Sequence, residues 1–235
     1  MNQTTDGCEP RPEIAEEFFG DRVGLADQYV EILTEEGVLR GLIGPSEPAR
    51  LWTRHVLNSA AVAEMIGPNL RVVDIGSGAG FPGIPLAIAR PDLDVVLIDP
   101  LLRRTTFLTE VIEKLGLDNV TVVRGRAEDQ AVIDQVVSAD VVTSRAVAPL
   151  DRLARWSAPL VRVGGQLVAL KGRTAADEIV EHREAAARVG LKELTTREVG
   201  SGLSEPTTVV IASRVETAGD RKAQRRAERR QKRKG

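Results

Sequence analysis

The chain has 235 residues, of which 42% are hydrophobic, 28% charged and 3% aromatic. This length and composition favour one α/β domain with a small extension and a core built on aliphatic side chains. One cysteine and two histidines exclude an internal disulfide framework and predict no metal-binding cluster. The sequence has no apolar run near the ~20 residues of a membrane span and no signal-peptide core. We therefore expect a cytoplasmic protein without membrane contact.

Charge is distributed unevenly along the chain. Residues 221–234 hold nine Lys or Arg and one acid, a net charge of +8, whereas residues 1–220 carry a net charge of −10. A basic arm on an acidic body is typical of chains that contact an anionic polymer such as RNA. A solvated end that only aids solubility is the alternative. We expect residues 215–235 to form a basic, disordered tail.

The first part of the sequence predicts helices. Residues 1–12 combine glycine and proline with few apolar side chains, which predicts a disordered N-terminus. Apolar residues then recur at helical spacing, and Ser46 followed by Pro48 is typical of the start of another helix. This pattern ends at a glycine–proline pair. We therefore expect a helical cap over residues 13–68.

Strand and helix patterns alternate after the cap, as in a parallel sheet with right-handed crossovers. Five expected parallel strands are followed by two runs that are separated by a glycine-rich turn and are typical of an antiparallel hairpin. The sequence thus predicts a seven-stranded, Rossmann-like α/β domain over residues 69–214. The expected strands are 71–75, 94–98, 120–123, 140–143, 166–170, 191–199 and 207–213, and the expected helices are 84–89, 102–115, 129–137, 150–160 and 175–189.

The loop after the first expected strand is the most informative stretch, because four glycines occur in it from Gly76 to Gly83. Glycine tolerates positive φ and lets a ligand approach bare backbone, and a helix start behind it favours a nucleotide-type cofactor. Part of the loop, Gly78-Ala-Gly80-Phe-Pro-Gly83, matches a dinucleotide-binding pattern. However, Asp74 precedes the first glycine, and a carboxylate suits the charges of S-adenosylmethionine better than a pyrophosphate. We predict an S-adenosylmethionine site; a glycine turn that binds nothing is the alternative.

Further candidates lie at the other expected strand ends and on the cap. Asp99 ends the second strand and suits a ribose diol. Arg145 leaves the fourth strand at the edge where open α/β sheets bind ligands, so we predict a functional role for it. Lys171 ends the fifth strand and either contacts phosphate or is plain surface. Arg54 and His55, on the cap, are either functional or partly buried polar groups.

The absence of certain catalytic residues from the sequence indicates which atom accepts the methyl group. Methyl transfer needs mainly that nucleophile and methyl group be held in line. Cys8 lies far from the strand ends, which excludes the cysteine-dependent methylation of pyrimidine carbon 5. Arg145 stands where many exocyclic-amine methyltransferases have an Asn/Asp-Pro-Pro-aromatic motif. A guanine N7 has a free lone pair and needs neither base nor nucleophile, so these absences favour it, with Asp74 or Glu128 assisting electrostatically.

Four motifs, in this order and at this spacing, resemble the small-subunit ribosomal RNA guanine-N7 methyltransferase family, RsmG or GidB. They are Arg54-His55-x-x-x-Ser59, Val73-Asp-Ile-Gly-Ser-Gly-Ala-Gly-Phe-Pro-Gly-Ile-Pro85, Ser144-Arg145-Ala146 and Ala169-Leu-Lys-Gly172. The resemblance covers roughly residues 25–213. It implies a class I S-adenosylmethionine-dependent methyltransferase that modifies a guanine, conventionally position 527, of 16S ribosomal RNA in the small ribosomal subunit. Many members carry Trp-Asn-Leu-Thr ahead of the Arg-His pair, whereas this chain has residues 42–48 there.

The resemblance also implies contacts to the cofactor, at Gly76, Phe81, the pair Ala127-Glu128 and Arg145. With the loop and the two acids, the predicted cofactor-binding set is Asp74, Gly76, Ser77, Gly78, Gly80, Phe81, Asp99, Ala127, Glu128 and Arg145. The candidates for a catalytic role, which acts by positioning, are Arg145, Lys171, Arg54 and His55.

RNA binding is expected to depend on phosphate contacts, because the few aromatic residues provide no stacking platform. The residues assigned to phosphates are Arg103, Arg104, Arg152 and Arg155. We expect a monomer. Two alternatives stay open: a methyltransferase of the same fold that acts on another RNA or a small molecule, and a non-catalytic, cofactor-sensing RNA-binding module.

Overall fold

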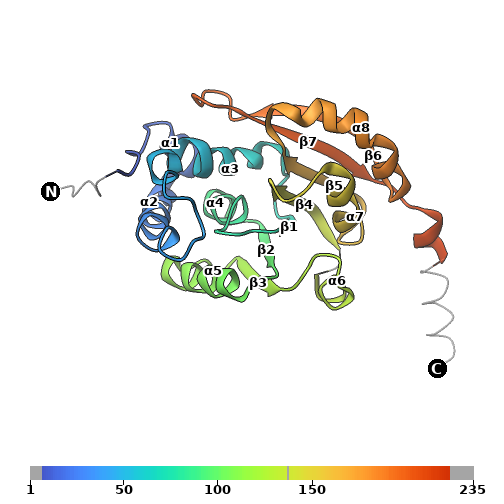
Figure 1. Cartoon of the computed structure of the whole chain (residues 1–235), viewed down its shortest axis with the longest axis horizontal. Helices are drawn as coiled ribbons and strands as arrows, with labels where there is room; N and C mark the ends of the chain where they lie inside the picture. Colours follow the sequence, from blue (N-terminus) through green and yellow to red (C-terminus); the bar gives the residue numbers. More distant parts are fainter. Residues whose placement is uncertain (1–6, 137, 223–235) are drawn as a thin grey trace.

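The computed structural model describes residues 7–136 and 138–222. Within them a seven-stranded sheet is flanked by helices on both faces, and the helical cap lies beside α4 and α5 (Figure 1). The strand order is β3-β2-β1-β4-β5-β7-β6, and β7 runs antiparallel to the other six strands. The predicted seven-stranded α/β sheet with a terminal hairpin is confirmed.

The strands follow the β-branched runs of the sequence, which suit a buried pleated surface. Five of them are longer than predicted, β2, β3 and β7 by one residue each and β4 and β5 by more, partly because the β4–β5 ladder continues back to the pair Ala139 and Val161. The strands are β1 (Arg71–Ile75), β2 (Asp94–Asp99), β3 (Val120–Arg124), β4 (Ala139–Arg145), β5 (Val161–Leu170), β6 (Leu191–Val199) and β7 (Thr207–Arg214).

The crossover helices lie close to their predicted positions, and α5 ends at Gly116 in the left-handed conformation that a glycine after a helix commonly adopts. These helices are α4 (Gly83–Ala89), α5 (Leu102–Leu115), α6 (Gln130–Val136), α7 (Leu150–Ser157), the 3₁₀ turn η6 (Gly172–Thr174) and α8 (Ala175–Arg188).

The cap consists of short helical segments of changing hydrogen-bond type. They are α1 (Ala15–Phe19), η1 (Gly20–Arg22), α2 (Val23–Ile32), η2 (Leu33–Gly37), η3 (Pro48–Arg50), η4 (Leu51–Leu57), α3 (Asn58–Ala60) and η5 (Ala61–Met65). The predicted helix start at Ser46 is wrong by one residue, since η3 follows Glu47 and has no side-chain cap. The Glu47 carboxylate instead binds Arg50 and His55.

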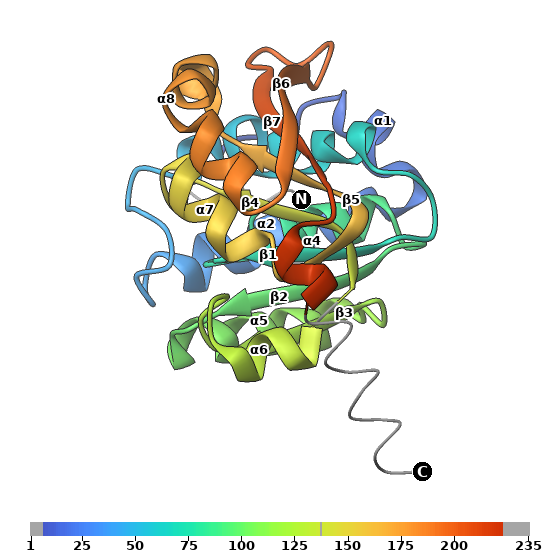
Figure 2. The same cartoon turned by 90° about the vertical axis from the view of Figure 1, so that its right-hand side faces the viewer.

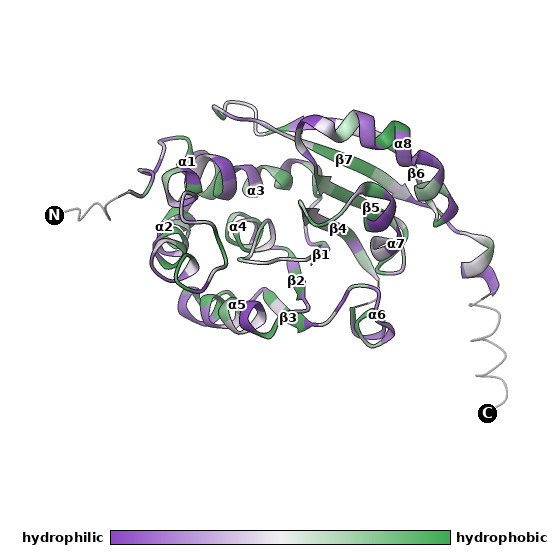
Figure 3. Ribbon diagram, in the orientation of Figure 1, coloured by the Kyte–Doolittle hydropathy of each residue, from purple (hydrophilic) through white to green (hydrophobic). Residues whose placement is uncertain are grey.

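The sheet has one core on each face because successive strand side chains alternate between faces. Val72 and Val95 pack with the cap, α4 and α5, whereas Val73 and Val96 pack with α6, α7 and α8. Figure 2 shows α8 with the β6–β7 hairpin at one end of the sheet and β3 with α5 and α6 at the other. Figure 3 shows mostly hydrophobic residues along β5 and β7 and hydrophilic ones on the outer helices.

Both ends of the described chain have defined contacts. Disorder was predicted for residues 1–12, but in residues 7–12 the Glu9 amide donates to the Pro48 carbonyl (3.0 Å) and its carboxylate accepts from the Thr53 amide (3.1 Å). Residues 1–6 lie outside the described residues. Near the other end, Arg214 pairs with Asp220 at 2.8 Å, and most of the predicted basic tail lies outside the described residues.

Close packing between α4 and the sheet gives a first prediction. A methyl group on Gly83 would overlap the Leu97 side chain, whereas one on Gly24 of α2 would face open space. Gly83→Ala is expected to lower the free energy of unfolding by about 1–3 kcal/mol through overpacking. Gly24→Ala, the matched control, is expected to raise it by about 0.5 kcal/mol. Urea denaturation measures both, and equal effects of the two substitutions contradict this account.

Candidate active site

The carboxyl ends of β1, β2, β4 and β5 bring most of the predicted site residues to one edge of the sheet. The glycine loop, residues 76–82, follows β1; Asp99 ends β2; Arg145 ends β4; and Lys171 follows β5. These four strands run parallel, and ligands of open α/β sheets bind at this edge. The cap adds Arg54 and His55 to the same place, because the Arg54 carbonyl accepts a hydrogen bond from Arg145 (3.0 Å).

The glycine loop directs its amides into the protein. Gly76, Gly78 and Gly80 have φ of 70°, 61° and 114°, values that favour glycine. The Gly76 and Ser77 amides donate to the Ile98 carbonyl, at 2.8 and 3.1 Å, and the Gly80 amide donates to the Ser77 carbonyl at 2.7 Å. A pyrophosphate would need these donors free. The loop geometry therefore argues against the dinucleotide interpretation.

The residues present fit the predicted cofactor. A Cβ on Gly78 would meet nothing closer than the Gly76 carbonyl at 3.8 Å, so the loop leaves open space above its backbone. Nearby, Asp74 Oδ1 and Arg145 Nη1 are buried polar atoms without a hydrogen-bond partner among residues 7–136 and 138–222. Buried polar groups are normally hydrogen-bonded, so two polar atoms with unmet hydrogen bonds lie beside a bare stretch of backbone. This set suits a polar ligand such as the predicted cofactor.

Asp74 supports the loop from behind. Its side chain is fully buried and Oδ2 accepts a hydrogen bond from the Gly83 amide at 3.1 Å. Burial raises the pKa of Asp74 to about 8. These contacts show that Asp74 braces the loop. Its contact with the cofactor stays a prediction.

Asp99 is a second buried acid behind the loop. Oδ2 accepts from the Gly78 amide (3.1 Å) and from Arg104 (3.2 Å), and Oδ1 accepts from the Leu101 amide (2.9 Å). Each oxygen of this carboxylate therefore has a donor from the protein. The ribose contact predicted for Asp99 stays a prediction, and in this structure the acid connects the loop to the start of α5.

An aromatic stack joins the cap to the sheet edge. The guanidinium carbon of Arg145 lies 5.4 Å from the centre of the Phe81 ring, and the His55 ring stacks on Phe81 at 5.2 Å and 27°. Glu47 binds His55 Nε2 and so fixes the orientation of the imidazole. Tyr29 packs edge-on against Phe81 (5.8 Å) and donates to the Ala79 carbonyl (2.8 Å).

Burial and charge shift the pKa values in this stack. Desolvation, assisted by the neighbouring Arg145 guanidinium, lowers the pKa of His55 to about 4, so the imidazole is neutral at physiological pH. Desolvation and the charge of Arg54 lower the pKa of Arg145 to about 10. A buried guanidinium next to a second guanidinium favours an anionic or strongly polar ligand. The predicted functional position of Arg145 agrees with this environment.

Lys171 has a different environment from the one its phosphate role requires. Its ammonium donates to the Ala148 carbonyl at 2.5 Å and to Glu178 at 2.7 Å, and the side chain is 6% exposed. Glu178 also accepts from the Leu150 amide (3.0 Å). Lys171 and Glu178 therefore hold the β4–α7 loop in place, and contact with phosphate is not supported by this geometry.

The remaining predicted contacts lie around the loop. Ser77 is buried and its hydroxyl donates to the Asp74 carbonyl at 3.1 Å. Ala127 is buried after β3, and Glu128 beside it is exposed. Their predicted contact with an adenine stays a prediction.

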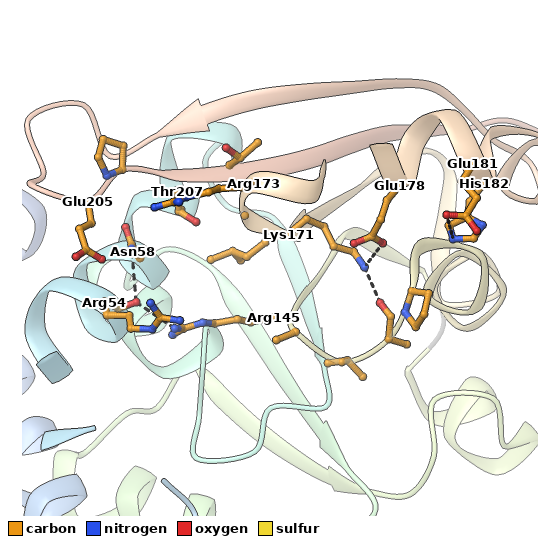
Figure 4. Close-up of a pocket in the computed structure, with 18 of the residues that line it drawn as sticks. Arg54, Asn58, Arg145, Lys171, Arg173, Glu178, Glu181, His182, Glu205 and Thr207 are labelled. Carbon is orange, nitrogen blue, oxygen red and sulfur yellow. Dashed lines mark hydrogen bonds and ion pairs between the residues drawn. The ribbon is translucent and has the colours of Figure 1, made fainter. Parts of the chain in front are cut away.

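A cleft of about 1410 Å³ opens next to the loop. Its walls come from η4 and α3 of the cap, the β4–α7 loop, the segment between β5 and α8, and the β6–β7 loop. Figure 4 shows Arg54 and Arg145 side by side in it, with Asn58 near them. Val147 lines the cleft and also lies against Gly76, where an added Cβ would come within 2.8 Å of it. The cleft thus adjoins the predicted cofactor site.

Sequence reasoning missed several residues of this site. Asn58 follows Arg54 by four residues, and that helical spacing was the available signal. Glu47, Tyr29 and Glu178 had no signal, because their partners are distant in sequence.

Solved structures define the class of the fold. Similar ones are a predicted O-methyltransferase from Agrobacterium tumefaciens (TM-score 0.54, 16% identity, 69% of this chain and 84% of that chain) and TYW2 of M. jannaschii in complex with AdoMet (0.53, 20%, 70% and 78%). At these identities they show the fold alone. The chain has the Rossmann-like fold of class I S-adenosylmethionine-dependent methyltransferases, as predicted.

Sequence relatives identify the family within this class. The sequence model of the family described as rRNA small subunit methyltransferase G matches residues 23–217. Proteins named ribosomal RNA small subunit methyltransferase G are similar: that of Mycolicibacterium gilvum is 52% identical (91% of this chain, 93% of that protein) and that of Rhodococcus jostii 54% (86% and 88%). The chain belongs to this family, also called GidB. It is a methyltransferase, and S-adenosylmethionine is its methyl donor.

Membrane contact was not expected, and among residues 7–136 and 138–222 no helix is long and apolar enough to cross a bilayer.

The buried carboxyl group of Asp74 gives a pH prediction. The folded state keeps its proton up to about pH 8, whereas an unfolded Asp loses it near its ordinary pKa of 3.8. Stability therefore falls as the pH rises between these values. The Asp74→Asn side chain cannot ionise. Its free energy of unfolding, relative to that of the wild type, is therefore expected to rise by up to about 1.4 kcal/mol per pH unit over this range. Urea denaturation of both proteins at about pH 5 and pH 8 measures the difference between their free energies of unfolding. The same difference at both pH values contradicts the prediction.

The contacts of Lys171 give a second prediction, with the exposed Arg173 as its matched control. Lys171→Met is expected to lower the free energy of unfolding by about 1–3 kcal/mol, because Glu178 and the Ala148 carbonyl lose their donor. Arg173→Met is expected to change it by less than about 0.5 kcal/mol. Thermal and urea denaturation measure both. If Lys171→Met is as stable as the wild type but binds RNA more weakly, the prediction is wrong and Lys171 contacts phosphate.

Proposed function

We propose that this chain transfers a methyl group to N7 of a guanine, conventionally position 527, in the 16S ribosomal RNA of the small ribosomal subunit. Membership of the rRNA small subunit methyltransferase G family over residues 23–217 carries the proposal. The large cleft beside the loop supports it, because a base of RNA with its neighbouring phosphates needs such a space.

The glycine loop and its neighbours would hold the cofactor. S-adenosylmethionine supplies a methyl group on a positively charged sulfur. The residues proposed to bind it are Asp74, Gly76, Ser77, Gly78, Gly80, Phe81, Asp99, Ala127, Glu128 and Arg145. Arg145 lies over the Phe81 ring of the loop and also lines the cleft, so it borders both the cofactor and the acceptor base.

Positioning would provide most of the catalysis. N7 of a neutral guanine has a free lone pair, so the chain needs to orient the base and exclude water rather than remove a proton. Arg145, held by Phe81 and the Arg54 carbonyl, is a rigid element for this purpose. The electrostatic assistance considered for Asp74 does not fit, because burial keeps this acid protonated below about pH 8.

Two exposed cations, Arg54 and Arg173, line the cleft, together with the acids Asp151, Glu178, Glu181 and Glu205. Arg103, Arg152 and Arg155 are exposed outside this lining and stay candidates for contacts with RNA phosphates. Arg104 was assigned to phosphate as well, but it pairs with the buried Asp99. The basic residues 223–235 lie outside the described residues. Action on ribosomal RNA agrees with the cytoplasmic location predicted, and the monomeric state stays a prediction.

Labelled S-adenosylmethionine, incubated with the chain and either small ribosomal subunits or naked 16S RNA, tests the proposal. We expect label in the RNA and chain cleavage at one guanine after reduction and aniline treatment, the reaction of 7-methylguanine. Label in a small molecule, in protein or nowhere would falsify the proposed acceptor. Comparison of the two RNA forms identifies the preferred substrate.

Two glycines with the same backbone conformation provide a matched pair of variants. Gly78 and Gly116 have φ of 61° and 62°, and a Cβ on either meets nothing within 3.5 Å. Alanine at either position is expected to cost about 1–2 kcal/mol of stability. Only Gly78→Ala is expected to weaken methyl transfer, by about tenfold or more, since its methyl group occupies the predicted cofactor site. Equal activities of the two variants count against that site.

A further inference from the structure

Asn58 is a buried amide with an unused acceptor in the wall of the cleft. It is 8% exposed, and its Nδ2 donates to the Arg54 carbonyl at 3.3 Å. This bond fixes which end of the amide is the donor, and Oδ1 then has no partner among the residues that the structure describes. Leaving a buried acceptor unpaired costs roughly 1–3 kcal/mol. An amide in this position is therefore matched to a donor that comes from outside the chain.

Arg145 presents the complementary group beside it. Its Nη2 donates to the same Arg54 carbonyl at 3.0 Å, so the two side chains converge on one oxygen atom (Figure 4). Its Nη1 is buried and unpaired, and the stack on Phe81 fixes the plane of the guanidinium. The wall of the cleft thus offers one free acceptor and one free donor as neighbours.

This pair matches one edge of guanine. Guanine presents the N1–H donor next to the O6 acceptor, whereas adenine presents the N1 acceptor next to the N6 amine, which is the reverse order. N7 lies on the other side of O6, so a contact at N1 and O6 leaves the N7 lone pair free. Single-stranded RNA is commonly recognised through this edge of an unstacked base.

We propose that Asn58 is a specificity-determining residue, whose Oδ1 accepts a hydrogen bond from N1–H of the acceptor guanine while Arg145 Nη1 donates to O6. This inference depends on the proposed function, since it assigns the base of the same acceptor. It also gives the cap a part in substrate choice, because Asn58 is the first residue of α3. The exposed Arg54 side chain, at the mouth of the cleft, is placed to contact the adjacent phosphate.

Target RNAs that differ in one base test the proposal. Inosine keeps N1–H, O6 and N7, whereas 2-aminopurine keeps N7 but has neither N1–H nor O6. For the wild type we expect similar kcat/KM with guanine and inosine and a value at least about 100-fold lower with 2-aminopurine. For Asn58→Leu we expect a loss of about 10- to 100-fold with guanine and inosine and little change with 2-aminopurine. The discrimination ratio should therefore collapse.

Two further variants separate recognition from folding. Asn58→Asp keeps an acceptor at this position and is expected to retain the discrimination, while Gln28→Leu, on the exposed side of α2, controls for loss of a polar amide. Circular dichroism and thermal denaturation confirm that each variant is folded. If Asn58→Leu lowers kcat/KM equally for all three bases, Asn58 only supports the structure and the inference is overturned. Absence of N7 methylation by the wild type overturns the proposed function itself.

Discussion

The stack of Arg145 on Phe81, and of Phe81 on His55, connects the three parts of the chain on which the site depends. Arg145 ends β4, Phe81 belongs to the glycine loop, and His55 belongs to the cap. Glu47 fixes His55 from behind, and the Arg54 carbonyl fixes Arg145 from the side. Because each side chain is held by another element, a shift of the cap would move the guanidinium and the loop together.

Two buried acids support the loop through different partners. Asp99 accepts three hydrogen bonds, one of them from Arg104. Asp74 accepts one from the Gly83 amide, and burial raises its pKa to about 8, so it is protonated at neutral pH. Two aspartates on neighbouring strands thus have different hydrogen-bond partners. The difference lies in the partners that tertiary structure supplies.

The sequence predicted the sheet better than the site. Strands β1 and β6 have their predicted bounds, because a buried strand next to a glycine turn leaves a strong local pattern. The loop glycines were also recognised, since positive φ selects glycine directly. For Lys171 the sequence left phosphate contact and plain surface open, whereas its partners are Glu178 of α8 and the Ala148 carbonyl of the β4–α7 loop. Asn58 was overlooked, because an amide has no local pattern of its own.

Local residue choice by itself determined the strands, the helices and the conformation of the glycine loop, since backbone preference and hydrophobic period act over a few residues. The motifs were also sufficient for the family. Only the tertiary structure decided which polar atoms stay free: Asp74 Oδ1, Asn58 Oδ1 and Arg145 Nη1 are among the eight buried side-chain atoms that have no partner within the described part of the chain. Whether a polar atom finds a hydrogen-bond partner depends on contacts between segments that are distant in sequence. An unpaired polar atom costs free energy only where it is buried away from water, and burial is also a property of the tertiary structure.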